Sequence, residues 1–170
     1  MKLKSAISDV EIIKKKIRLY VSNKIFFLNN KNKYLIISTT KPETILGDSA
    51  IAINPNDNRY NKFIGKKIIV PLINRIIPII SDNNVYINKE TGCMKVSPAH
   101  DFIDYEIALK NNLDIINVIN KEGKTNNILE IYKNLNFNIK YYENIPYYFK
   151  NISINILKYR ILFLLKKKIF

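Results

Sequence analysis

The chain has 170 residues, 47% of them hydrophobic, and a formal net charge of +14. This length suits one compact domain with its own core, and the hydrophobic content argues against an intrinsically disordered chain. One cysteine (Cys93) and one histidine exclude an internal disulfide and are too few for a typical zinc site. No apolar run reaches the ~20 residues that cross a bilayer, and the start lacks the apolar region of a signal peptide. We therefore expect no membrane contact, no metal or cofactor, and a cytoplasmic location.

The positive charge permits two interpretations. A basic protein attracts polyanions, chiefly nucleic acids. Alternatively, Ile, Lys and Asn all have codons rich in A and T, so a nucleotide bias would raise the lysine count without any role in function. Charge alone therefore indicates association with polyanions and says nothing about the fold.

The first third of the chain has a β pattern. Strands are expected at 10–20 and 24–28, with a turn at Ser22–Asn23 between them and a second turn at 29–33. A buried strand, YLIIS at 34–38, leads into a hydroxyl-rich loop, in which Pro42 suits the first position of a short helix after a threonine cap. The loop from Ser38 to Thr44 is a candidate site for a phosphate or ribose, or it simply caps this helix.

The rest of the chain alternates between strands and a few helices. The expected strands are 49–53, 67–71, 75–80, 93–97, 114–119 and 136–142, and the expected helices are 55–64, 101–112 and 128–135. The helix at 101–112 has the clearest pattern, because Asp101 and two further carboxylates fall at its start. Residues 146–170 give no prediction. Many strands with few helices favour an α+β or barrel-like domain over a doubly wound sheet.

The densest group of polar side chains lies in KVSPAHDFIDYE, residues 95–106. Alternation places Lys95 and Ser97 on one side of a strand, and Asp101 and Asp104 point together from the helix. If these faces meet, they form a pocket that binds an ammonium group and a hydroxyl, and that rejects an analogue without the hydroxyl. The alternative is a solvated helix start with Asp101 as its cap. A triad of Ser97, His100 and Asp101 is disfavoured, because triads usually join separated segments.

Two segments, TTKPETILGDSAIAINPNDNRY (39–60) and TGCMKVSPAHDFIDYE (91–106), closely resemble the editing domain of valyl-tRNA synthetase. Further matches are LKSAISDVEI (3–12), IPIISDNNVYI (77–87) and NNLDIINVINKEGKTN (111–126). The resemblance implies the β-barrel-like editing domain of class I aminoacyl-tRNA synthetases, with a few peripheral helices. Residues 1–145 would form this domain, and 146–170 would be a C-terminal extension of unpredicted structure.

The implied activity is hydrolysis of the ester of mischarged Thr-tRNA(Val). Valyl-tRNA synthetase is itself a standard example of a hydrophobic pocket that fails to reject an isostere carrying a hydroxyl. The implied partners are the 3′ end of tRNA(Val) carrying threonine and, if the chain is a fragment, the rest of valyl-tRNA synthetase. A monomer is expected. Nothing resembles a nucleotide-binding signature, so this chain alone is not expected to activate valine.

The resemblance also implies residue roles by position. Lys95, Asp101 and Asp104 would be catalytic, with Asp104 holding the amino group of threonine. Water would attack the ester, without a covalent intermediate. The residues implied to bind the substrate are Thr39, Thr40, Lys41, Ser97 and His100.

Three departures from the family pattern support another interpretation. Lys41 replaces an arginine, Lys89 and Glu90 replace an aromatic residue and a glycine, and the tail after residue 145 does not match. The second hypothesis is therefore a non-catalytic remnant that binds the tRNA acceptor end. The third, a generic basic RNA-binding protein, depends only on the charge.

Overall fold

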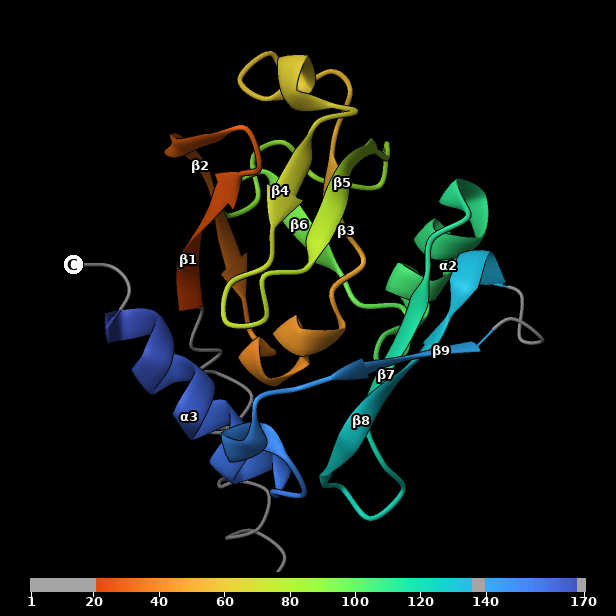
Figure 1. The fold of residues 1–170 in the computed structure, drawn as a ribbon. Coiled ribbons are helices and arrows are strands. Elements are labelled where there is room, and N and C mark those ends of the chain that lie inside the picture. Colours follow the sequence, from red (N-terminus) through yellow and green to blue (C-terminus); the bar gives the residue numbers. More distant parts are fainter. Residues whose placement is uncertain (1–20, 136–139, 168–170) are drawn as a thin grey trace, which may run out of the picture.

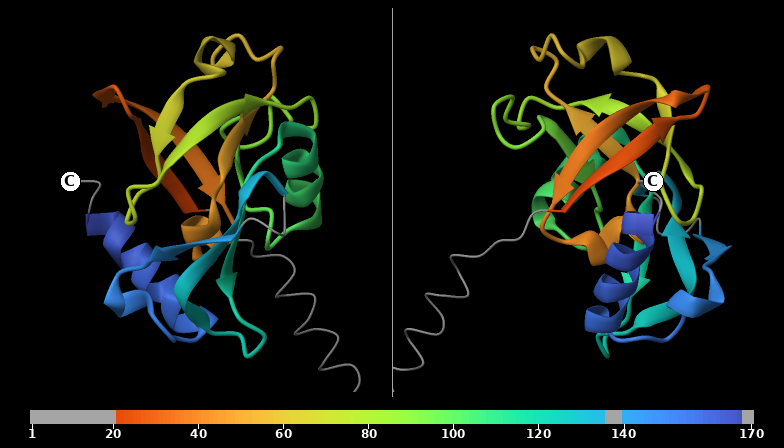
Figure 2. Two further views of the ribbon diagram at one scale, coloured as in Figure 1. Left: turned by 45° about the vertical axis from the view of Figure 1, so that its right-hand side comes forward. Right: turned by 90° about the vertical axis from the view of Figure 1, so that its left-hand side faces the viewer.

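The computed structural model describes residues 21–135 and 140–167. A six-stranded sheet curls into a nearly closed barrel (Figures 1 and 2). Its strands are β1 (Val21–Phe27), β2 (Asn30–Thr39), β3 (Ala50–Ile53), β4 (Lys67–Ile69), β5 (Ile76–Ser81) and β6 (Cys93–Val96). Their order is β2-β1-β4-β5-β3-β6, and the edge strands β2 and β6 approach each other at the seam. Only β3 and β5 pair in parallel.

A smaller antiparallel sheet lies beside the barrel (Figure 1). It consists of β7 (Ile115–Ile119), β8 (Thr125–Tyr132) and β9 (Lys140–Asn144), with β8 in the centre. The strand β7 also packs against η1 (Pro42–Gly47), the short 3₁₀ helix that follows β2. The small sheet is therefore joined to the barrel close to the seam.

Two α-helices flank the barrel. The helix α2 (Phe102–Asn111) begins with Asp101, whose side chain accepts a hydrogen bond of 3.0 Å from the backbone N of Ile103. It ends at Asn112, which has a left-handed φ of 50°. The second, α3 (Ile154–Lys167), follows a 3₁₀ turn η4 (Tyr147–Phe149) and packs against η1. Among the described residues, neither helix is long and apolar enough to cross a membrane.

The apolar side chains form two clusters. The larger one fills the barrel and extends to α3, where Leu157, Ile161 and Leu165 recur every four residues on one face. The smaller one joins β3 and β6 to α2 through Ile107 and Ala108. This second cluster fixes the start of α2 next to the end of β6, which matters for the site below. The division of the chain at residue 145 stays a prediction.

The predicted fold class, α+β with a barrel-like sheet and peripheral helices, is confirmed. The predicted turn at Ser22–Asn23 is wrong, because both residues lie within β1 and pair with β2. The predicted turn at 29–33 is shorter, since β2 already begins at Asn30. The strand expected at 10–20 lies outside the described residues, as do residues 136–139 of the strand expected at 136–142.

Two predicted helices are wrong. Residues 55–64 form turns and only the short 3₁₀ helix η2 (Asn61–Phe63). Here Asn54 and Asp57 each accept a hydrogen bond from a backbone N two residues later, which competes with helix formation. Residues 128–135 lie mainly in β8, where pairing with a strand on each side outweighs the helical pattern. A further correction concerns η1, whose cap is Lys41 without a side-chain bond, although Pro42 does take the first position.

Candidate functional site

A pocket of about 510 Å³ opens near the seam of the barrel, where β2 and β6 end and α2 begins. Such a volume suits a small ligand. All eight predicted site residues line it: Thr39, Thr40, Lys41, Lys95, Ser97, His100, Asp101 and Asp104. The predicted meeting of the strand face with the helix start is therefore observed.

Asp104 is a carboxylate on α2 that is anchored just after the end of β6. Its Oδ2 accepts a hydrogen bond of 2.8 Å from the backbone N of Ser97, and the residue is 8% exposed. Within the described residues, Oδ1 makes no hydrogen bond, so one oxygen stays available to a ligand in the pocket. Burial raises the pKa of Asp104 to about 6, although the Ser97 amide and the Lys95 charge oppose the rise.

Lys95 is held beneath the pocket by three acceptors. Its Nζ donates to Thr44 Oγ1 at 2.6 Å, to Asp48 Oδ1 at 2.9 Å and to Ser97 Oγ. An ammonium group has three N–H donors, so each is taken by one protein oxygen. In this geometry Lys95 lines the pocket and positions the two hydroxyls of Thr44 and Ser97, while its three N–H groups are taken by protein oxygens.

Asp48 was missed by the sequence-based prediction. It follows the helix η1, is 1% exposed, and accepts a further hydrogen bond of 2.6 Å from Ser97 Oγ. Its Oδ2 has no hydrogen-bond partner among the described residues. Burial raises the pKa of Asp48, while the Lys95 ammonium and the Ser97 hydroxyl oppose the rise. The signal was present in the sequence, because Asp48 is a carboxylate between the apolar segments ILG and AIAI.

Lys41 and Asp101 face each other across the mouth of the pocket. Lys41 Nζ lies 2.8 Å from Asp101 Oδ2, and the side chains are 50% and 34% exposed. Burial acts to raise the pKa of Asp101, but the hydrogen bond and charge of Lys41 outweigh it and lower this pKa below its usual value. Asp101 thus combines the predicted cap with an ion pair. Thr39 fixes the same loop by accepting a bond of 3.0 Å from the Lys41 backbone N.

His100 points its Nε2 at the small sheet, where it accepts a hydrogen bond of 3.3 Å from the backbone N of Val118. Burial, assisted by the charges of Lys95 and Lys41, lowers the pKa of His100 to about 4. The imidazole is therefore neutral at pH 7. Ser97 Oγ bonds instead to Asp48 and Lys95, so the disfavoured Ser97–His100–Asp101 triad is not formed.

The pocket wall also contains Lys89 and Glu90, two positions that, like Lys41, depart from the family pattern. Glu90 has a φ of 54°, the left-handed conformation that favours glycine. Two residues later, Gly92 has a φ of 77°, and a Cβ there would lie 2.5 Å from Arg59 Nη2. Glycine is thus required at 92, and the backbone at 90 has the conformation expected where the family has glycine.

The site combines the free carboxylate oxygen of Asp104, the Thr44 and Ser97 hydroxyls bonded to the buried Lys95 ammonium, and the exposed ammonium of Lys41. The carboxylate of Asp104 can bind an ammonium group. The hydroxyl protons of Ser97 and Thr44 are donated to Asp48 and to the Lys41 carbonyl, so these two oxygens can accept a hydrogen bond from a ligand hydroxyl. Within the described residues there is no cluster of His, Cys, Asp and Glu that could hold a metal ion. The site is therefore suited to a small ligand that carries both an amino group and a hydroxyl.

Comparison with known proteins identifies the class. Residues 58–147 match the family described as leucyl-tRNA synthetase, editing domain. The match covers more than half of the chain, and the chain belongs to this family of aminoacyl-tRNA synthetase editing domains.

Within that class, the chain is similar to curated valine–tRNA ligases. It is 50% identical over 137 residues to the enzyme of Buchnera aphidicola subsp. Baizongia pistaciae, covering 76% of this chain and 14% of the enzyme. It is 41% identical over 175 residues to that of Buchnera aphidicola subsp. Schizaphis graminum, covering 98% and 18%. The predicted resemblance to the valyl-tRNA synthetase editing domain is therefore confirmed. The chain spans less than a fifth of these relatives.

Two solved structures are also similar. One is the ternary complex of Agrobacterium radiobacter K84 agnB2 LeuRS-tRNA-LeuAMS, with a TM-score of 0.49 and 16% identity over 64% of this chain and 17% of that one. The other is the crystal structure of GlLeuRS-CP1, with a TM-score of 0.45 and 14% identity over 55% of this chain and 61% of that one.

Proposed function

We propose that the chain hydrolyses the ester of threonine mischarged to tRNA(Val), in the cytoplasm, as part of translational quality control. The observation that carries this proposal is the carboxylate of Asp104, anchored at 2.8 Å by the Ser97 amide with its second oxygen available to the pocket. A threonyl ester presents an ammonium group next to a hydroxyl-bearing side chain. Asp104 binds the ammonium group, and the hydroxyl meets Ser97 and Thr44.

The reaction needs only water as co-substrate. The water oxygen attacks the ester carbonyl carbon, the bond between this carbon and the ribose oxygen breaks, and the ribose oxygen takes up a proton. Threonine and the free tRNA 3′ end leave. The protein contributes chiefly by positioning the ester and by stabilising charge on the carbonyl oxygen.

The other pocket residues fall into supporting roles. Lys95 supplies a fixed positive charge beneath the hydroxyls of Ser97 and Thr44. Lys41 and Asp101, joined across the pocket mouth, contact the terminal ribose together with Thr39 and Thr40. His100, neutral and bonded to Val118, shapes the wall next to the substrate. The substrate is the 3′ end of tRNA(Val), and the remainder of a valyl-tRNA synthetase is the proposed partner of the chain, which itself acts as a monomer.

Selectivity follows from one hydrogen bond that only the threonyl ester can make. The hydroxyls of Ser97 and Thr44 already donate to Asp48 and to the Lys41 carbonyl and accept from Lys95, so each can accept one further bond, from the threonine hydroxyl. Valine has a methyl group in this position and makes no such bond, which weakens its binding by about 0.5–1.5 kcal/mol. The pocket should therefore prefer the threonyl ester.

The test is the release of threonine from Thr-tRNA(Val) by the chain, by Asp104→Asn and by Glu106→Gln. Glu106 lies on the same helix but is exposed and does not line the pocket, so its variant controls for charge loss on α2. Release by the parent and by Glu106→Gln, but not by Asp104→Asn, supports the proposal. Equal release by all three contradicts it.

A second candidate is a domain that binds the tRNA end without chemistry. It is favoured by Lys89 and Glu90, which place two charged side chains in the pocket wall where the family pattern has an aromatic residue and a glycine. In this case the parent binds an acceptor-end RNA but releases no threonine.

A further inference from the structure

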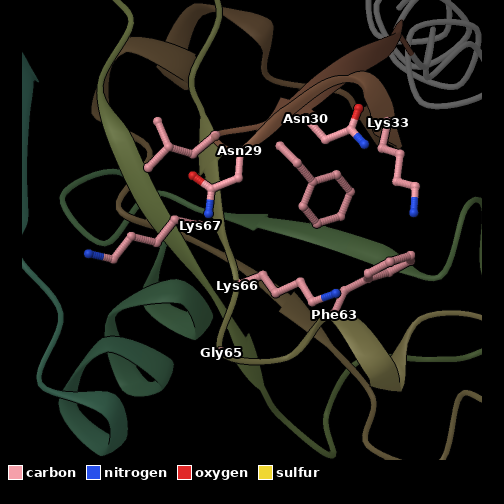
Figure 3. Close-up of a pocket in the computed structure, with 9 residues that line it drawn as sticks. Asn29, Asn30, Lys33, Phe63, Gly65, Lys66 and Lys67 are labelled. Atoms are coloured by element: carbon pink, nitrogen blue, oxygen red, sulfur yellow. The ribbon is translucent and has the colours of Figure 1, made fainter.

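A second pocket lies at the opposite end of β2 from the candidate site. It has a volume of about 490 Å³ and is formed by the β1–β2 turn, η2 and the start of β4 (Figure 3). The candidate site is lined by Thr39, at the end of β2, and the second pocket by Asn30, at its start. Asn30 and Thr39 are nine residue steps apart along β2, which corresponds to at most about 30 Å at 3.3 Å per residue, because β2 is irregular before Tyr34.

The second pocket carries positive charge without compensation. Lys33, Lys66 and Lys67 line it and are exposed. The segments 21–39 and 61–70 contain no aspartate or glutamate. Elsewhere in the described structure Lys41, Lys95 and Lys140 have carboxylate partners, whereas no ion pair in the described residues involves the three lysines of this pocket. What distinguishes these lysines is that three of them line one pocket between two segments without a carboxylate.

An aromatic residue organises part of this charge. The Nζ atoms of Lys62 and Lys66 lie 5.4 and 5.2 Å from the centre of the Phe63 ring, and this ring packs against Phe27 at 4.9 Å. Figure 3 shows the Lys66 side chain running beside Phe63, while Lys67 extends away from it. Cation–π contacts hold an ammonium group in place, which reduces the ordering cost of binding an anion. The side chains of Asn29 and Asn30 add amide groups to the pocket.

We propose that this pocket, through Lys33, Lys66 and Lys67, is a second RNA-binding site that takes backbone phosphates of the RNA strand whose end enters the candidate site. The ammonium groups of the three lysines are spread over the pocket, together with two side-chain amides and the half-buried ring of Phe63. Such an arrangement suits the successive phosphates of a nucleic-acid backbone. One ligand that occupies both the candidate site and the second pocket must span up to about 30 Å, which an extended polyanion does and a small molecule does not. The inference rests on the proposed function for the entry of the RNA end into the candidate site, whereas phosphate binding here does not depend on ester hydrolysis.

The binding test uses the triple variant Lys33→Gln, Lys66→Gln, Lys67→Gln. Its matched control is Lys110→Gln, Lys121→Gln, Lys124→Gln, which removes the same charge from exposed positions on α2 and the β7–β8 turn. The probe is a labelled RNA hairpin with a single-stranded CCA end, and its affinity is measured by fluorescence anisotropy over a range of salt concentrations. Unfolding midpoints confirm that both variants are folded.

The pocket variant should bind the hairpin about tenfold or more weakly at low salt, and the slope of log K against log salt should become shallower by roughly two. The control should change both quantities much less. Equal losses in the two variants would show that only total charge matters and would overturn the proposal, as would unchanged binding in the pocket variant.

A second comparison separates this inference from the proposed function. A 3′-threonyl ester of adenosine fills only the candidate site, whereas a threonylated hairpin reaches both. The pocket variant should lose kcat/KM on the hairpin and keep that on the adenosine ester. If the parent hydrolyses neither, the proposed function fails, and the anisotropy result still decides on the RNA site.

Discussion

Lys95 and Asp48 form an ion pair of 2.9 Å beneath the candidate site, with side chains that are only 10% and 1% exposed. The pair joins the strand β6 to the end of η1, two segments 47 residues apart in sequence. Two hydroxyls, those of Thr44 and Ser97, complete the group. A buried charge pair of this kind is costly to break, because the remaining charge has no compensation.

Removing one partner of this pair should therefore destabilise the fold strongly. Asp48→Asn leaves the Lys95 ammonium buried without a carboxylate, and a loss of about 3–5 kcal/mol is expected. The double variant Asp48→Leu, Lys95→Met should recover much of that loss, since neither charge remains. Urea unfolding of the parent, of Asp48→Leu, of Lys95→Met and of the double variant measures the coupling. The exposed pair Lys140–Glu130 is the control, and its disruption should have little effect. Additive losses at Lys95 and Asp48 would contradict the observed pairing.

Two glycines with similar backbones should respond differently to alanine. Gly65 has a φ of 82° and open space around a built Cβ, so Gly65→Ala should cost only the left-handed strain of about 1–2 kcal/mol. At Gly92, with a φ of 77°, the Cβ would also lie 2.5 Å from Arg59 Nη2 and 2.9 Å from Asp57 Oδ2.

Gly92→Ala should thus be clearly less stable than Gly65→Ala in urea unfolding. The difference reports the displacement of the Asp57–Arg59 pair and the close approach to the Ile87 carbonyl, at 3.1 Å from the built Cβ, because both glycines have a left-handed φ. Equal losses would mean that this pair moves aside freely.

The pH dependence of stability should have opposite signs for two pocket residues. The pKa of Asp104 is raised from 3.8 to about 6, so the folded state binds the extra proton and its contribution to stability is lost as pH rises through this range. The pKa of His100 is lowered from 6.5 to about 4, so its contribution is lost as pH falls through that range. Each effect is on the order of 3 kcal/mol and they oppose each other.

Stability relative to the parent should consequently improve for Asp104→Asn as pH rises from 4 to 7, and improve for His100→Gln as pH falls over the same range. Chemical denaturation at several pH values measures both trends. If the relative stability of both variants changed in the same direction with pH, at least one of the two pKa shifts, that of Asp104 or that of His100, would be contradicted.

Lys41 should matter for the reaction and hardly for the fold. Its ion pair with Asp101 has side chains 50% and 34% exposed, and such pairs contribute about 0–1 kcal/mol. Lys41→Ala should leave the unfolding midpoint almost unchanged and should raise KM for the threonylated RNA. Lys41→Arg, which restores the residue of the family pattern, should keep or improve KM. A large loss of stability in Lys41→Ala would assign this residue a structural role instead.

The sequence predicted the grouping of the pocket residues better than some of the elements around them. Short-range rules place Lys95 and Ser97 on one strand face and start a helix at Asp101, and these features are observed because β6 and α2 are locally encoded. What joins them is the small core cluster with Ile107 and Ala108, a long-range contact that periodicity does not report. Asp48 was missed for the same reason, since its partner is 47 residues away.

The wrong predictions have a common origin. The helix expected at 128–135 has a suitable pattern, but its residues are the central strand of a sheet whose other members lie on both sides in sequence. Residues 55–64 fail as a helix because Asn54 and Asp57 bond to the local backbone. Local patterns thus compete with tertiary pairing and with side-chain bonds to the backbone.

The most direct measurement of the central claim is the ratio of kcat/KM for threonyl and valyl esters on one tRNA(Val) preparation, for the parent and for Ser97→Ala. The parent should hydrolyse the threonyl ester with a clear preference, and Ser97→Ala should lose that preference, because a hydroxyl facing the threonine side chain has been removed. Equal hydrolysis of the two esters by the parent, or a preference that survives in Ser97→Ala, would contradict the claim that this pocket recognises threonine by its hydroxyl.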